Sequence, residues 1–150
     1  MQSNPGSPHS DLTLAARPGA ARQARRHVAR VLPGWGMAGL ADTAELLASE
    51  LVTNAVRATA ALVAAAPGED RPPVVPPDRL GTIRLRLSRP GGRLRIEVWD
   101  ADGRPPVPRA ADADAEGGRG LLLVAALSAG WGWHPARDGG KVVWCEPAGP

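Results

Sequence analysis

The chain has 150 residues, a net charge of +3 and a sequence isoelectric point near 10.3. A chain of this length builds one hydrophobic core, and an isoelectric point that comes from arginines at so small a net charge does not by itself indicate a nucleic-acid-binding protein. The single cysteine, Cys145, excludes an internal disulfide, and three scattered histidines offer no cluster of zinc ligands.

The first ten residues are polar and contain no basic segment followed by an apolar one, and the chain has no run of eighteen apolar residues. Neither a secretory signal nor a membrane span is therefore expected. We predict a flexible N-terminal leader over residues 1–18, one domain over residues 19–147, a cytoplasmic location and no membrane contact.

Two amphipathic helices come first in the expected domain. Over residues 20–32, apolar side chains recur on one stripe between arginines. The second helix runs to about Ala65 and begins at Asp42 or Thr43, either of which can cap it. The arginines of the first helix could steer a polyanion, but a solvated helix face explains them better, so a nucleic-acid partner is not expected.

Strands and a long loop follow. The segments 81–88 and 93–99 alternate apolar and polar residues and predict an antiparallel hairpin. Residues 100–120 predict a functional loop, because a loop of that length is uncommon in a small domain. A helix over 121–129 and a last strand over 141–146 complete the order. This order predicts an α/β fold, a two-layer sandwich with a mixed sheet and helices on one face.

Glu50 and Asn54 interrupt the apolar residues of the second helix in SELVTNAVR. Residues four apart project from the same face of a helix, one turn from each other. A carboxylate and an amide are costly to bury without partners, so this pair is expected to line a polar cavity. A helix side that simply meets solvent is the alternative.

A hydrophobic strand ends directly in Asp100, Asp102 and Gly103, in VWDADG. A carboxylate at a strand end can accept hydrogen bonds from an exocyclic amine, and glycine permits the close approach of a flat ring. An acidic turn or a calcium site would give the same letters. Calcium is disfavoured because no further oxygen ligands follow at regular spacing.

Three glycines around Arg119 lead into the next helix in EGGRGLLLV. Gly118 and Gly120 would let backbone amides turn toward a phosphate, while the helix N-terminus and the arginine add positive charge. The pattern is neither a P-loop nor a dinucleotide fingerprint. A flexible hinge is the alternative reading.

In this order, and followed by GWGW and GGKVVW, the three segments resemble the GHKL superfamily of DNA gyrase, MutL repair proteins and histidine kinases. Within it, the chain resembles the anti-sigma-factor serine/threonine kinase branch and its short actinobacterial members. The resemblance covers roughly residues 20–146. ELVTNAVR is similar to the N box, VWDADG to the first glycine box, and residues 116–121 to the second. It implies the Bergerat ATP-binding fold for residues 19–147.

The resemblance also implies a mechanism that uses ATP and Mg²⁺. Glu50 would act as the general base, and Asn54 would bind both the cofactor and the magnesium ion. Asp100 would bind the adenine amine. The remaining residues expected to bind ATP are Asp102, Gly103, Gly118, Arg119, Gly120 and Leu121. The implied reaction transfers the γ-phosphate to a serine on an antagonist protein, in a system in which the domain also binds a sigma factor and can form a homodimer.

Three departures from the family pattern bear on this interpretation. Aspartate stands where glycine is expected in the first glycine box, a histidine after the N box is absent, and a threonine of the last strand is replaced. The positions concerned are Asp102, Ala58 or Thr59, and Val142 or Val143. They favour an alternative function, a catalytically weak or inactive ATP-binding module that regulates partners by sequestration. The retained Glu50 favours the kinase.

Two further classes are less well supported by the sequence. A histidine-kinase fragment would need a long helix pair with a phospho-acceptor histidine, and none is predicted. A nucleic-acid-binding protein rests on the arginines of the first helix alone, and a mobility shift that vanishes at moderate salt would mark such binding as nonspecific.

Overall fold

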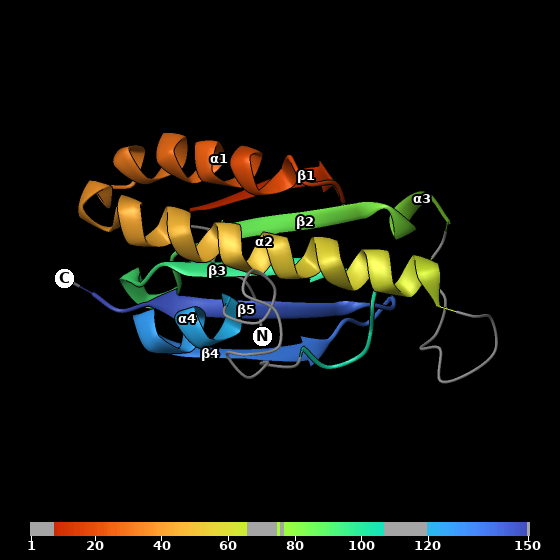
Figure 1. The fold of residues 1–150 in the computed structure, drawn as a ribbon. Helices are drawn as coiled ribbons and strands as arrows, with labels where there is room; N and C mark the ends of the chain where they lie inside the picture. Colours follow the sequence, from red (N-terminus) through yellow and green to blue (C-terminus); the bar gives the residue numbers. More distant parts are fainter. Residues whose placement is uncertain (1–7, 66–74, 76, 107–119, 150) are drawn as a thin grey trace.

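The computed structural model describes residues 8–65, 75, 77–106 and 120–149. Five strands form one sheet in the order β1-β2-β3-β5-β4, and three helices cover one of its faces (Figure 1). The expected two-layer α/β sandwich is thereby confirmed. The strands are β1 His9–Ala15, β2 Thr82–Ser88, β3 Arg95–Asp100, β4 Ser128–Pro135 and β5 Lys141–Pro147. The helices on the sheet are α1 Ala20–Gly34, α2 Ala41–Ala64 and α4 Gly120–Leu127. Three single turns, η1 Ala38–Leu40, α3 Pro77–Leu80 and η2 Pro90–Gly92, connect them.

The expected leader is wrong for its second half, because His9–Ala15 forms edge strand β1. It pairs antiparallel with β2, from His9 opposite Ser88 to Ala15 opposite Thr82. Leu14 is buried in the core, and Ser10 Oγ lies 2.8 Å from His27 Nε2 on α1. The sheet therefore begins ten or so residues earlier than the composition indicated, and residues 1–7 lie outside the described part.

All four strand pairings are antiparallel, so the expectation of a mixed sheet is wrong in this detail. The chain leaves β3, forms α4, enters the sheet again at the far edge as β4 and turns back as β5 between β4 and β3. Strand β4 runs in the same direction as β3, so β5, which returns from β4 in a hairpin, runs against both neighbours. The β2–β3 hairpin was predicted and is confirmed.

Helix α2 is the central element of the helical layer. It packs on α1, α4 and β3, with Leu47, Leu51 and Val52 fully or almost fully buried. By length and hydropathy the segment Ala38–Ala64 could cross a membrane, but these side chains pack in the core of the domain. No side chain caps α2, contrary to the expected cap at Asp42 or Thr43, because η1 continues directly into the helix.

The last predicted helix ends at Leu127, two residues early, where β4 begins. On the sheet face away from the helices, the Trp144 ring lies across the glycines of β4. A Cβ added at Gly132 would lie 3.1 Å from this ring, and one at Gly130 would lie 3.9 Å from it. The Arg95 guanidinium stacks over the same ring, 4.5 Å from its centroid, and Arg95 Nε donates to Glu146 Oε2 over 3.1 Å. The glycines of GWGW therefore leave space for the tryptophan of GGKVVW.

Candidate functional site

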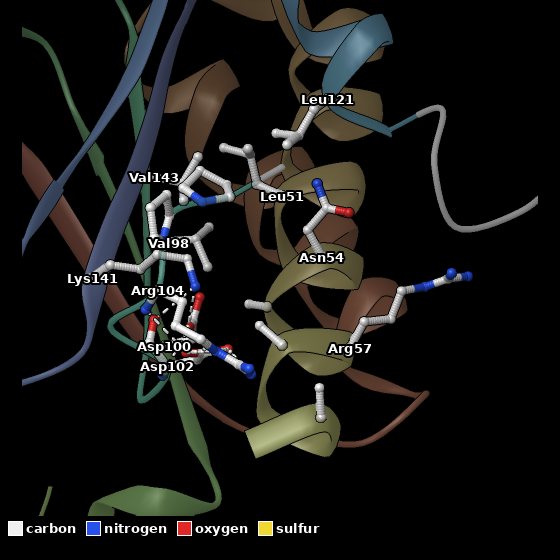
Figure 2. A pocket seen from close by; sticks show the side chains of 15 residues that line it. Leu51, Asn54, Arg57, Val98, Asp100, Asp102, Arg104, Leu121, Lys141 and Val143 are labelled. Atoms are coloured by element: carbon white, nitrogen blue, oxygen red, sulfur yellow. Dashed lines mark hydrogen bonds and ion pairs between the residues drawn. The ribbon is translucent and has the colours of Figure 1, made fainter. Parts of the chain in front are cut away.

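A cavity of about 500 Å³ lies between α2 and the strands β3 and β5. This volume is within the usual range of small-molecule sites. Figure 2 shows Asp100, Asp102, Arg104 and Lys141 gathered on the strand side, with Asn54 and Arg57 on α2 across from them. Apolar side chains complete the walls, among them Leu51, Ala55, Val98, Leu121 and Val143. The cavity thus combines apolar walls with charged and polar side chains on two opposite sides.

Asp100 and Lys141 form a buried ion pair at the strand end of the cavity. They are direct partners in the β3–β5 register, and Lys141 Nζ donates to Asp100 Oδ1 over 3.0 Å. Their side chains are 2% and 4% exposed. Burial raises the pKa of Asp100 to about 6, although the charge and hydrogen bond of Lys141 act in the opposite direction. The carboxylate is therefore ionised at neutral pH but close to its titration range.

Asp102 organises the turn that follows β3. Its carboxylate accepts three hydrogen bonds from the Arg104 guanidinium, the shortest from Nη2 to Oδ2 at 2.8 Å and from Nε to Oδ1 at 2.9 Å, and one from the Arg104 amide at 3.0 Å. Its amide donates to Asp100 Oδ1 and its carbonyl accepts from Lys141 Nζ. Burial alone raises the pKa of Asp102, but the hydrogen bonds and charges of Arg104, with the charge of Lys141, lower it. The aspartate that replaces the expected glycine is therefore a turn-forming residue whose side chain is already paired.

Glu50, Asn54 and the start of α4 meet beside the cavity. A Cβ added at Gly120 would lie 2.8 Å from Glu50 Oε2 and 3.4 Å from Asn54 Oδ1. Asn54 lines the cavity, and its Nδ2 is buried without a hydrogen-bond partner among the described residues. A buried polar atom without a partner is costly, so the Asn54 amide has hydrogen-bonding capacity available for a ligand or a water molecule. Glycine at position 120 brings the N-terminal end of a helix directly against this carboxylate and amide.

A family match covers most of the chain, including every residue that lines the cavity. Residues 14–145 match the histidine kinase-like ATPase domain. The chain belongs to this family. The histidine kinase-like ATPase domains are part of the GHKL superfamily, so the superfamily assignment from the sequence is confirmed. Membership implies that this ATPase domain binds ATP.

A curated relative is similar over part of the domain. It is an uncharacterized protein of Streptomyces coelicolor, 41% identical over 70 residues, which are 45% of this chain and 65% of that protein. The match thus covers slightly less than two thirds of the relative's own length.

The site residues predicted from the sequence divide into three groups in this ATPase domain. Asn54, Asp100, Asp102 and Leu121 all line the cavity between α2, β3 and β5. Glu50, Gly120 and the half-buried loop residue Gly103 are not among the lining residues, although a Cβ added at Gly120 would reach both Glu50 and Asn54. Gly118 and Arg119 lie outside the described residues. The roles assigned to all of them stay predictions.

Lys141 was not predicted as a site residue. It follows Gly140 in the GGKVVW segment. The backbone of Gly140 has φ +78° and packs against the Asp100 carbonyl and the Trp99 ring. The signal in the sequence was that a chain rich in arginine carries one lysine. Of the two valines that could replace the family's threonine, Val143 lines the cavity, whereas Val142 pairs with Trp99 and contacts a separate cluster.

Asn54 and Glu50 fit a magnesium ion and the phosphates of ATP on two observations. The unpartnered amide of Asn54 has a free polar atom, and a half-turn of the amide exchanges its donor and acceptor. With no side chain at position 120, the backbone at the start of α4 can approach both groups, because a Cβ there would lie 2.8 Å from Glu50 Oε2 and 3.4 Å from Asn54 Oδ1. An amide oxygen is a suitable ligand for a hard cation.

Proposed function

We propose that this ATPase domain is a protein serine/threonine kinase of a partner-switching system, which phosphorylates an antagonist protein and also binds a sigma factor. The observation that carries the proposal is the contact of Gly120 with Glu50 and Asn54. It brings a general base candidate, a cation ligand candidate and a helix N-terminus together at one end of the cavity.

Each residue has a chemical task in this proposal. Glu50 Oε2 would accept the proton of the incoming hydroxyl, for which a carboxylate beside a partly open cavity is suited. Asn54 would hold Mg²⁺ through its amide oxygen without adding negative charge near the base. Magnesium, when bound, supplies positive charge at the transferred phosphoryl group. Asp100 would accept a hydrogen bond from the adenine amine, and Arg57 at the cavity wall would attract the phosphates.

Calorimetry with ATP, with and without magnesium, tests the nucleotide site. The proposal expects magnesium-dependent binding that weakens at least about tenfold in Asn54→Ala, the loss of one good ligand. Glu50→Gln should keep ATP binding and lose transfer of labelled phosphate to antagonist proteins from the source genome by about 100-fold or more. Arg93→Ala, in an exposed turn, is the matched surface control. A Glu50→Gln variant that transfers phosphate at the native rate would remove Glu50 from the mechanism.

A second function is favoured by the pairing inside the cavity. Asp100 is bound by Lys141, and Asp102 is bound by Arg104. Both acidic groups expected near the adenine ring therefore already have cationic partners. We therefore retain the ATP-binding module that sequesters partners, including a second copy of the chain, without phosphorylating them. ATP binding together with no phosphate transfer to any antagonist would favour this module over the kinase.

A further inference from the structure

The ammonium group of Lys141 lies in the cavity wall with unused hydrogen-bonding capacity. It lines the cavity and donates to Asp100 Oδ1 over 3.0 Å and to the Asp102 carbonyl over 2.8 Å (Figure 2). A lysine ammonium has three donors, so one remains. No described residue accepts it.

Asp100 likewise keeps an unused acceptor. Its Oδ1 accepts from Lys141 and from the Asp102 amide, whereas Oδ2 accepts from no described residue. The Arg104 guanidinium does not compete for this oxygen, because it is bound to Asp102. The cavity wall therefore offers a carboxylate acceptor and an ammonium donor side by side.

We propose that Lys141 is a base-contacting, specificity-determining residue, and that the donor–acceptor pair of Lys141 and Asp100 lets the site bind 6-oxopurine nucleotides as well as adenine nucleotides. This inference rests on the proposed nucleotide site. Asp100 Oδ2 accepts from the base while Lys141 Nζ donates to the neighbouring acceptor atom of the ring edge.

The hydrogen-bonding edges of the purines explain the expected selectivity. Adenine offers its N6 amine as donor beside a ring nitrogen acceptor. Guanine and hypoxanthine offer the N1–H donor beside the O6 acceptor, so they match the same pair after a shift by one ring position. A lone carboxylate would instead face O6 with an unpaired acceptor, and buried sites reject such ligands strongly.

The side chains next to Lys141 and Asp100 do not favour adenine over the 6-oxopurines. Val98 and Val143 line the same part of the cavity and offer only apolar contact, which does not distinguish one purine from another. Lys141 also favours the charged form of Asp100 against the effect of burial, which raises the pKa of that carboxyl to about 6. At neutral pH the carboxylate thus remains an acceptor.

Calorimetry of the full chain with the magnesium complexes of ATP, GTP and ITP tests the inference. Native protein should bind GTP and ITP within about tenfold of ATP. Lys141→Met should weaken GTP and ITP by about 100-fold and ATP by no more than about tenfold, in keeping with one discriminating polar pair. Arg137→Met, an exposed cation near the same strand, should leave all ratios unchanged.

A second variant covers the case in which Lys141→Met does not fold, because it leaves Asp100 buried without a cation. Lys141→Gln keeps a neutral donor, and we expect GTP to weaken about tenfold relative to ATP. Thermal unfolding of each variant establishes that it is folded before titration.

The failures are distinguishable. ATP binding with a GTP-to-ATP ratio that neither lysine variant changes overturns this inference alone. The same holds for native protein that binds ATP and rejects GTP by more than about 1,000-fold, and for ATP binding that appears only after Lys141 is replaced. If no nucleotide binds to any folded variant, the inference and the proposed function both fail.

Discussion

Gly120 lies against Glu50 so closely that a Cβ at position 120 would lie 2.8 Å from the carboxylate oxygen Oε2. The first residue of α4 and the middle of α2 are thus fitted to one another across the helical layer. This relationship explains why a glycine stands at the start of a helix, where alanine has the higher intrinsic propensity.

Gly120→Ala should separate activity from stability. The added Cβ displaces the flexible end of Glu50 and the Asn54 amide, so phosphate transfer, or ATP affinity if the chain is not a kinase, should fall by about 10- to 100-fold. The unfolding midpoint should shift by only a few degrees, since alanine is favoured in helices. Gly19→Ala is the control, because Gly19 has nothing within 4 Å of its added Cβ. Equal activity in the two variants would contradict this prediction.

Gly140→Ala should destabilise the fold. Gly140 has φ +78°, and an added Cβ would overlap the Asp100 carbonyl and approach Trp99 Nε1 to 2.8 Å. Backbone strain and overpacking together should cost about 3 kcal/mol of unfolding free energy, measured in urea. Gly91→Ala, at φ +63° in open space, carries the strain without the overlap and should cost about 1–2 kcal/mol. Similar losses at both positions would mean that the contact with β3 contributes nothing.

The contribution of Asp100 to the unfolding free energy should fall as pH rises. Burial raises its folded-state pKa to about 6 from an ordinary 3.8. A raised pKa means that the favourable contribution is complete below about pH 3.8 and is lost as pH rises through about 6. Relative to Asp100→Asn, native protein should therefore lose up to about 3 kcal/mol between pH 4 and pH 7, measured by urea unfolding.

The contribution of Asp102 to the unfolding free energy should depend on pH in the opposite direction, and the same experiment measures it. Although burial raises its pKa, Arg104 and Lys141 lower it overall, so its contribution is present at neutral pH and is lost as pH falls. The difference between native protein and Asp102→Asn should grow from pH 3 to pH 6. Parallel pH profiles for the two asparagine variants would contradict the assigned environments.

Arg95→Ala should weaken the helix-free face of the sheet by about 1 kcal/mol, measured by urea unfolding. Arg95 bonds Glu146 at 3.1 Å and stacks on Trp144 at 4.5 Å, so one substitution removes both contacts. Arg86→Ala should change the free energy by less than about 0.5 kcal/mol, because its pair with Asp11 is long at 3.7 Å and exposed on both sides. A larger loss for Arg86 than for Arg95 would reverse this ranking.

Local patterns were sufficient for much of the fold, but not for the meeting of distant segments. Glu50 and Asn54 share a helix face, and Asp100 ends a strand, because these relations depend on residues close in sequence. That Asn54, Asp100 and Leu121 share one cavity followed from the family resemblance, which carries the three-dimensional arrangement that periodicity lacks.

The relations that were missed depend on strand pairing. Lys141 meets Asp100 across 41 residues of sequence, and only the β3–β5 register establishes that contact. Strand β1 was missed because HSDLTLA has two leucines in a polar segment, too short a pattern to separate from a leader. Its pairing partner, β2, lies more than sixty residues further along the chain, so no local turn signal announced it.

The burial of Lys141 has a practical consequence for chemical labelling. The chain contains one lysine, so an amine-reactive reagent has the ε-amine of Lys141 and the terminal α-amine as its targets. Lys141 is 3% exposed, and its ammonium is held between Asp100 and Asp102. The rate of modification of this one lysine, measured by mass spectrometry, would report how often the cavity opens around Asp100 and Lys141. A bound nucleotide would slow the modification. The protein thus carries its own occupancy reporter, which needs no introduced probe.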